Sequence, residues 1–148
     1  THGADFERSD TWPSPYQSQL HVPIAVQSPG GEPLRVHSAV QLTDLPLTIV
    51  NLLGLSAQEG WGGVDILSHH HTENGIPTRP VFTEFSDQKI KWDAVRMDDW
   101  KLVRRRSEPF REELYNLRDD PFEKVNVINE NQQQRQRMID LLRERTKR

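Results

Sequence analysis

The first half of the chain contains two apolar segments of different character. The run VPIAV at 22–26 is short, continuous and ended by SPGGEP, a pattern that predicts a buried strand. A helix is predicted at 44–53, with Asp44 as its N-cap, Pro46 in its first turn and Gly54 ending it. Four apolar side chains are expected to share one face of this helix: Leu45, Ile49, Leu52 and Leu53.

The second half changes to a hydrophobic period of two, which is typical of strands. Four short segments show this period: 80–85, 92–97, 100–105 and 112–117. Asp98 and Asp99 join the second segment to the third and have the composition of a tight hairpin turn. Because the connections are short, we expect an antiparallel meander of four strands, and one face of such a sheet needs a cover.

That cover is predicted to be a C-terminal helix at 129–147. Asn129 together with Gln132 resembles a capping box at its start. Met138, Leu141 and Leu142 form a narrow apolar stripe along it. We expect this stripe to pack on the sheet.

These elements divide the chain into two predicted domains. Residues 1–78 hold a loop, the strand at 22–26, the helix at 44–53 and a Gly- and His-rich loop, whereas 79–148 hold the small sheet and the terminal helix. The strand at 22–26 has no partner strand nearby in the sequence, although its backbone groups must be paired. We therefore expect it to belong to a sheet whose other strands lie outside this sequence.

Composition and charge narrow the possible chemistry. The 148 residues contain no cysteine, which excludes disulfides, thiolate zinc sites and a cysteine nucleophile within them. No apolar run approaches the roughly 20 residues that cross a bilayer. The net charge is −3, but from Arg135 onwards six Lys or Arg stand against two acids. These cations complement the dipole of a solvated helix; an anionic polymer or a membrane surface is the alternative partner.

Five motifs occur in the order in which one known family carries them. They are THG at 1–3, YQSQLHVPIAVQSPG at 16–30, SAVQLTDLPLTIVNLLGL at 38–55, AVRMDDWKLVRR at 94–105 and ELYNLRDDPFEKVN at 113–126. Together they resemble the C-terminal third of a sulfatase of the alkaline-phosphatase-like superfamily. The resemblance implies an α/β fold in which one strand and one helix of a large sheet precede a four-stranded antiparallel sheet covered by a C-terminal helix.

The resemblance also implies an activity. Sulfatases hydrolyse sulfate monoesters with a divalent metal, usually calcium, and with a formylglycine made from Cys or Ser in a C/S-x-P-S/A-R motif near the N-terminus. The expected partners are a missing N-terminal catalytic part, which would share the metal, and a sulfated small molecule or glycan as substrate, with no nucleic acid and no membrane. This chain alone is expected to be inactive because it lacks the nucleophile. Family members are often exported, which favours a periplasmic or secreted location.

Two histidines are the candidate site residues that the resemblance suggests. His2 occupies the family position whose His or Asn faces the metal, but calcium prefers oxygen ligands, so we expect His2 near the sulfate or in a second shell. His21 stands just before the strand, where the family has Arg or His, and is a possible pocket-lining residue. The segment before Tyr16 lacks the Lys or His that often contacts sulfate in the family, so no catalytic residue is assigned within this chain.

Four other features have simpler structural interpretations. Lys101 is expected to be a solvated strand lysine, and Arg104–Arg106 are expected at the surface because neighbours on a strand alternate in direction. The sequence SEPFR at 107–111 superficially fits the nucleophile motif but falls in a hairpin link rather than at a helix start. The three histidines at 69–71 are expected in a solvent loop, since adjacent residues rarely converge on one metal ion.

Three alternatives to a sulfatase portion stay open. The same superfamily includes phosphate and phosphonate monoesterases, and the residues that choose the ester would lie upstream. A non-catalytic module that binds a sulfated polysaccharide or a partner subunit would use the meander and the basic helix. An α+β domain without a recognisable active or binding site is the third alternative.

Overall fold

A computed structural model describes residues 14–27, 31, 35–70, 76–86 and 89–146. The chain divides into two compact units. The first unit holds the residues up to Val22, 82–95 and those from Trp100 onwards, and the second holds 23–81 and 96–99. No helix in the described part of the chain is both long and apolar enough to span a membrane.

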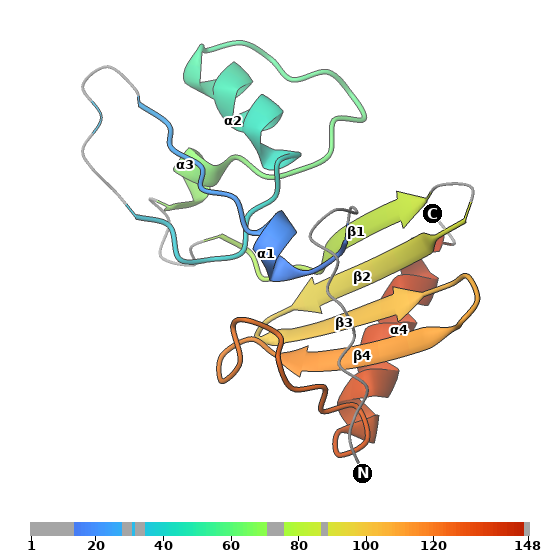
Figure 1. The fold of residues 1–148 in the computed structure, drawn as a ribbon. Helices are drawn as coiled ribbons and strands as arrows, with labels where there is room; N and C mark the ends of the chain where they lie inside the picture. The colour runs from blue at the N-terminus through green and yellow to red at the C-terminus, as the bar shows by residue number, and fades with distance from the viewer. Residues whose placement is uncertain (1–13, 28–30, 32–34, 71–75, 87–88, 147–148) are drawn as a thin grey trace. The chain divides into compact units, whose positions relative to one another are not determined.

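Four strands form one open antiparallel sheet in the order β1-β2-β3-β4 (Figure 1). The strands are β1 (Val81–Ser86), β2 (Lys91–Met97), β3 (Trp100–Arg105) and β4 (Arg111–Asn116). Asp98 and Asp99 turn the chain between β2 and β3, and Asp98 has a φ of 56°, a conformation that aspartate tolerates better than most residues. The predicted meander is confirmed, and each strand lies within one residue of its expected position.

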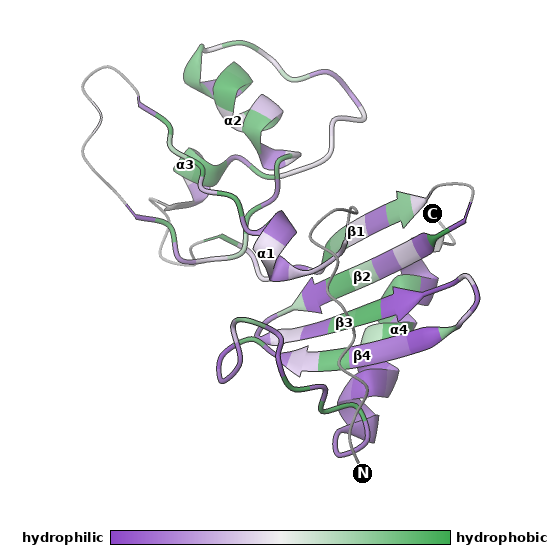
Figure 2. Ribbon diagram, in the orientation of Figure 1, coloured by the Kyte–Doolittle hydropathy of each residue, from purple (hydrophilic) through white to green (hydrophobic). Residues whose placement is uncertain are grey.

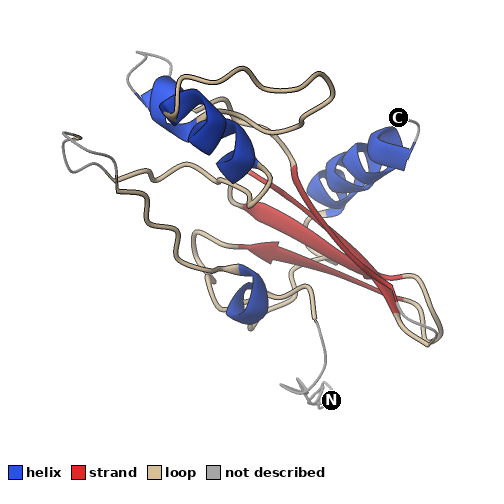
Figure 3. Ribbon diagram, turned by 90° about the horizontal axis from the view of Figure 1, so that it is seen from above, coloured by secondary structure: helices blue, strands red, loops and turns tan. Residues whose placement is uncertain are grey.

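The helix α4 (Gln132–Thr146) covers one face of this sheet, as predicted (Figure 3). Leu102 of β3 pairs in register with Leu114 of β4, and both are fully buried, as is Met138 of α4. This compact apolar layer forms because strand side chains alternate between faces, which places these two leucines on the side of the helix.

The start and the buried stripe of α4 differ from the prediction. Residues 128–130 form turns, and the first helical hydrogen bond runs from the N–H of Arg135 to the carbonyl of Asn131 at 2.9 Å. The expected capping box of Asn129 with Gln132 is therefore wrong, because the helix begins at Gln132 itself. The buried apolar positions of the helix are Met138, Ile139 and Leu142, so Ile139 takes the place expected for Leu141.

The opposite face of the sheet is covered by the segment around Tyr16 and the short helix α1 (Gln17–Leu20). The Tyr16 ring packs edge-on against Trp92 and Tyr115, with ring centroids 6.5 and 6.4 Å apart. Ala94 and Val103 complete this second apolar cluster. The sheet is thus covered on both faces. This explains why consecutive residues in the middle of β2, β3 and β4 are buried, instead of buried and exposed residues alternating along each strand.

The second unit contains α2 (Asp44–Leu52) and α3 (Ile66–His70). The predicted helix is confirmed, but Thr43 occupies the N-cap position and Asp44 is the first helical residue. The buried carboxylate of Asp44 accepts hydrogen bonds from the N–H groups of Gln41 at 2.8 Å and Val64 at 3.0 Å, and it pairs with Arg79. Asp44 therefore links α2 to two other segments of this unit.

The loop predicted at 56–78 is interrupted by α3. The carboxylate of Asp65 caps this helix by accepting the N–H groups of Leu67 at 3.0 Å and Ser68 at 3.2 Å. The expectation of a solvent loop is therefore wrong at 66–70, because the capping signal at Asp65 was missed. His71 lies outside the described residues.

The apolar face of α2 points outward within the second unit, and Figure 2 shows the hydrophobic residues along this helix. Ile49, Leu52 and Leu53 are 47%, 44% and 65% exposed, whereas Asp44 and Thr48 on the other side are buried. The four-residue face predicted from the sequence exists, but three of its side chains, at 49, 52 and 53, are exposed rather than packed. Large apolar patches of this kind mark surfaces that another segment or partner covers.

The strand predicted at 22–26 does not form within the described residues. Its backbone belongs to no sheet, and Val22 and Val26 are 48% and 43% exposed. The physical reason is that a strand exists only when a neighbour supplies the ladder hydrogen bonds, and the described residues offer none to this segment. The expectation that it lacks a partner here agrees with this arrangement.

Candidate functional site

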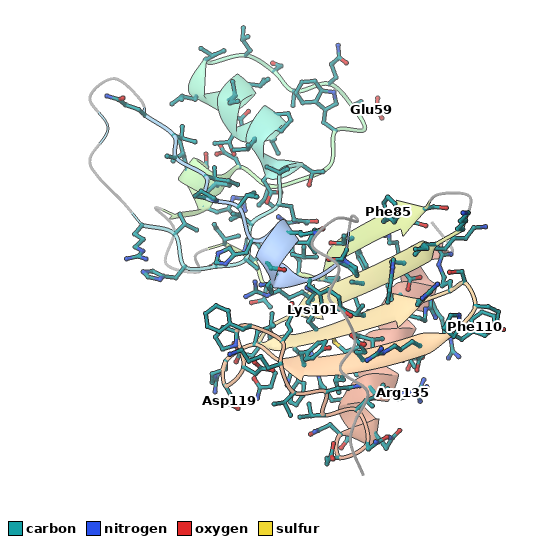
Figure 4. All side chains as sticks on the ribbon, in the orientation of Figure 1. Glu59, Phe85, Lys101, Phe110, Asp119 and Arg135 are labelled. Carbon is teal, nitrogen blue, oxygen red and sulfur yellow. The ribbon has the colours of Figure 1, made fainter. Side chains whose placement is uncertain are left out.

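A buried ion pair joins β3 to the turn that follows β4. Nζ of Lys101, labelled in Figure 4, lies 2.6 Å from Oε1 of Glu123, and the two side chains are 3% and 1% exposed. The other carboxylate oxygen of Glu123 accepts the backbone N–H of Gln17 at 2.6 Å. The prediction of a solvated Lys101 is wrong because its face of the sheet is covered by the Tyr16 segment.

A second buried carboxylate, Glu113, lies on the same face of the sheet. Its Oε2 accepts hydrogen bonds from the hydroxyls of Tyr16 at 2.7 Å and Tyr115 at 2.8 Å. Its Oε1 pairs with Nε of Arg111. Three donors therefore compensate the burial of this charge, as a buried carboxylate requires.

The turn after β4 is fixed by its own polar groups. Glu123 has a φ of 56°, in the left-handed region that is unfavourable for a side chain of its size. Oδ1 of Asn126 accepts the N–H groups of Leu114 at 3.0 Å and Ile128 at 3.1 Å. The motif ELYNLRDDPFEKVN thus supplies Glu113, Glu123 and Asn126 as structural residues, which hold the Tyr16 segment and the last turn on the sheet.

The second unit has a polar cluster around Asp65. Asn51 donates to its Oδ2 at 3.0 Å, and the hydroxyl of Ser68 donates to the same oxygen. Burial of Asp65 alone would raise its pKa, but the hydrogen bonds from Ser68, Asn51 and the backbone outweigh it and lower the pKa below the usual value. A carboxylate held ionised in this way stabilises the junction of α2 and α3 and is a poor proton donor.

The three arginines predicted at the surface, Arg104–Arg106, line an open cleft beside the β3–β4 hairpin. Arg104 donates to both carboxylate oxygens of Asp93, at 2.9 and 2.7 Å, and this hydrogen bonding raises the pKa of the Arg104 guanidinium above its usual value. Their partial exposure agrees with the prediction, whereas the cleft itself was not predicted from the sequence.

The histidines predicted at the site are not brought together by the described residues. His2 lies outside them, so its role stays a prediction. His21 is exposed and its backbone N–H closes α1 by donating to the carbonyl of Gln17 at 2.9 Å, and its pocket-lining role likewise stays a prediction. His69 contacts the carbonyl of its own helix cap, Asp65, through Nδ1 at 3.0 Å.

The described residues do not fit the ligand set of the expected calcium ion. In the part of the chain that the structure describes, no three His, Cys, Asp or Glu side chains gather in a way that would hold a metal. The buried carboxylates of Glu113 and Glu123 are already occupied by cationic and hydroxyl donors. No catalytic step is therefore derived through a metal held by these residues alone.

Comparison with known proteins gives structural neighbours only, since no family model and no curated protein matches the chain. BT4656, solved with its substrate D-glucosamine-2-N,6-O-disulfate, is 19% identical with a TM-score of 0.61 over 70% of this chain. Ps i-CgsB is 24% identical with a TM-score of 0.60 over 74% of this chain. A Bacteroides thetaiotaomicron protein assigned as a sulfatase is 21% identical with a TM-score of 0.55 over 70%.

The chain matches only a small part of each of these proteins. It spans 23% of the length of BT4656 and 24% of each of the other two. Ps i-CgsB has also been solved in complex with a neocarrahexaose. At these identities the likeness is one of fold.

Proposed function

Since this chain has the fold of the C-terminal portion of a sulfatase, we propose that it is the C-terminal portion of a sulfatase-like hydrolase that cleaves sulfate monoesters. The observation that carries the proposal is the match of most of this chain to about a quarter of much longer proteins. A protein of this kind needs the remaining residues for its chemistry.

Two surfaces of the chain support the need for a larger partner. The segment at 22–26 has apolar residues and no ladder in the described chain, and the distal apolar face of α2 is exposed. A large sheet contributed by an N-terminal catalytic part would pair the first and cover the second. Both would then be buried, as their composition favours.

The buried network around Lys101 and Glu113 has a positioning role in this proposal. It fixes Tyr16 and Gln17 on the small sheet. This anchored segment lies between His2 and His21, the two residues that the resemblance places near the site. By holding Tyr16 and Gln17, the small sheet would help to position the two chain segments that flank them, which contain His2 and His21.

The nucleophile and the calcium would come from outside this chain. When bound, calcium supplies the electrostatic stabilisation that sulfate-ester hydrolysis needs. A formylglycine residue of the upstream part would supply the nucleophile. Because the described residues offer neither, we propose that the 148-residue chain alone is inactive. The substrate class is a sulfated sugar, which the substrate of BT4656 supports.

The test compares the isolated chain with a polypeptide extended to include the upstream coding region. We expect the extended polypeptide to hydrolyse an aryl sulfate in the presence of calcium, and the isolated chain to show no turnover above a denatured control. Replacement of the Cys or Ser in an upstream C/S-x-P-S/A-R motif by Ala should abolish the activity. Turnover by the isolated chain, or an aryl phosphate preferred over the aryl sulfate, would contradict the proposal.

A further inference from the structure

The second unit contains a small polar cavity of about 200 Å³. Three parts of this unit line it: residues 37–39, residues 76–79, and Arg96 with the turn residues 98 and 99. One water molecule takes up about 30 Å³, so the cavity has room for roughly six waters. It therefore suits a small ligand, or one part of a longer ligand.

Arg79 is one of two arginines that line this cavity. One terminal nitrogen of its guanidinium pairs with the fully buried carboxylate of Asp44, and its Nε is buried with no acceptor among the described residues. A guanidinium has five N–H donors in a fixed plane. Asp44 thus fixes the orientation of the group, while most of its donors have no partner in the described part of the chain.

Arg96, at the end of β2, also lines the cavity and has few protein contacts. Its Nε donates to the backbone carbonyl of Asp98 at 3.5 Å, which is longer than a typical hydrogen bond. Among the residues that the structure describes, no carboxylate pairs with its guanidinium. Arg96 therefore brings unused terminal N–H donors to the same cavity as Arg79.

The cavity carries no excess of positive charge. The charge of Arg79 is offset by Asp44, and the lining also contains the carboxylates of Asp98 and Asp99 beside Arg96. Both of these acids also interact with other groups, and no acidic or histidine side chains of the described residues gather as a metal site. This balance of charges disfavours a sulfate ion or a metal ion and favours a neutral ligand.

The mixture of donors and acceptors in the lining matches hydroxyl groups. A hydroxyl both donates and accepts hydrogen bonds, whereas an arginine only donates and a carboxylate, with about four lone-pair sites, only accepts. Ser38 and Thr78 add hydroxyls of their own, and Ile76 and Pro77 add apolar surface. A sugar unit presents the matching combination, with several hydroxyls around a ring of C–H groups.

We propose that this cavity binds an unsulfated edge of one sugar unit, with Arg79 and Arg96 donating hydrogen bonds to its hydroxyl oxygens. The carboxylates at 98 and 99 accept hydrogen bonds from the same hydroxyls. That the sugar belongs to a glycan substrate rests on the proposed function. All the lining residues belong to the second unit, so binding does not require the upstream catalytic part.

The test is an NMR titration of the isotope-labelled 148-residue chain with a desulfated carrageenan hexasaccharide. We expect the Nε–H signals of Arg79 and Arg96 and the amide of Ser38 to shift with one Kd of about 1–10 mM, the affinity that a few hydrogen bonds supply. The amide of Leu102, in the first unit, should not move. Because the ligand is neutral, the Kd should change little between about 50 and 150 mM salt.

Two variants test the assigned donors. Arg96→Gln should weaken the Kd about threefold to tenfold without loss of stability, because its side chain makes no ion pair among the described residues. Arg79→Lys keeps a cation for Asp44 but removes the planar set of donors, so it should weaken the Kd by a similar factor. Thermal unfolding shows whether each variant folds, and Arg96→Gln alone decides if Arg79→Lys does not.

A matched variant outside the cavity serves as the control. Arg143→Gln removes an exposed arginine of α4 and should leave the Kd unchanged. Binding of the sulfated hexasaccharide but not of the desulfated one, or its displacement by inorganic sulfate, would show an anion site and overturn the proposal. Equal shifts with glycerol, an equal loss in the control variant, or no shift at about 20 mM hexasaccharide would also overturn it. None of these results bears on turnover by the extended polypeptide, so the two proposals fail separately.

Discussion

The hydroxyl of Tyr16 donates a hydrogen bond of 2.7 Å to Oε2 of Glu113, two residues that are 97 positions apart in the chain. This bond and the adjacent bond from Gln17 to Glu123 tie an N-terminal segment to the C-terminal sheet. Both acids lie in the motif at 113–126. The resemblance that the motif carries therefore reflects the architecture of the sheet rather than a reacting group.

Removal of the Tyr16 hydroxyl tests the contribution of its hydrogen bond with Glu113 to stability. Tyr16→Phe keeps the ring contacts with Trp92 and Tyr115 but takes one of three donors from the buried Glu113 carboxylate. We expect a loss of about 1–2 kcal/mol in the free energy of unfolding. Urea unfolding measures it, and an unchanged slope would show that the denatured state is unaffected. A variant as stable as the wild type would contradict the assigned hydrogen bond.

The Lys101–Glu123 ion pair gives a sharper test. Lys101→Met leaves the Glu123 carboxylate buried without its cation, so we expect a loss of about 3–5 kcal/mol. Replacing both residues, as Lys101→Met with Glu123→Gln, removes the uncompensated charge while keeping an acceptor for the Gln17 N–H, and should recover most of that loss. Equal unfolding free energies for the single and double variants would show that the two groups do not interact.

One added methyl group should have different effects at two neighbouring glycines. Gly63 has a φ of 106°, and a Cβ there would lie 2.4 Å from the backbone carbonyl oxygen of Thr43. Gly63→Ala should therefore destabilise the chain by about 1–3 kcal/mol. Gly62, beside which nothing lies within 4 Å, is the control, and Gly62→Ala should have little effect. Thermal unfolding of both variants measures the difference. Similar melting temperatures for the two variants would contradict the close approach of residue 63 to the Thr43 carbonyl.

The pH dependence of stability should reflect Asp65. The pKa of its carboxyl is lowered in the folded chain, whereas an unfolded aspartate has a pKa of about 3.9. Its contribution is therefore complete above the unfolded pKa and is lost as the pH falls through the lower folded pKa. Asp65→Asn should be less stable than the wild type at pH 7, with the difference shrinking below about pH 4.

An exposed acid controls for general effects of charge. Glu59 is exposed in the same unit, and Glu59→Gln should shift the melting temperature little at any pH. A constant difference between Asp65→Asn and the wild type from pH 7 to pH 3 would refute the assignment of the lowered pKa to the folded state.

The sequence predicted elements whose signals are local. Period-two patterns located all four strands, and the helix at 44–53 and the turn at Asp98 were also correct. The resemblance to the C-terminal third of a sulfatase is confirmed at the level of fold. The helix at 66–70 was missed because five residues show no period, and only the side chain of Asp65 marks its start.

The candidate sites depended on contacts that local patterns do not carry. A lysine on an alternating strand gives no sign that a segment 84 positions earlier covers it, so the burial of Lys101 was not predictable. The opposition of Arg105 to Arg111 depends on the register of the hairpin, which a link of irregular length leaves undetermined. The absence of a partner strand for 22–26 among the described residues was predictable, because the sequence shows no other strand pattern near this segment.

The central proposal is that the segment at 22–26 pairs with strands of a larger sulfatase-like sheet. Amide hydrogen exchange at Ile24–Gln27 tests this proposal most directly. In the isolated chain we expect these amides to exchange as fast as exposed ones, while those of Leu102 and Leu114 are protected. In the polypeptide extended to include the upstream coding region they should become protected. Protection of 24–27 in the isolated chain equal to that of β3, or none in the extended polypeptide, would contradict the account.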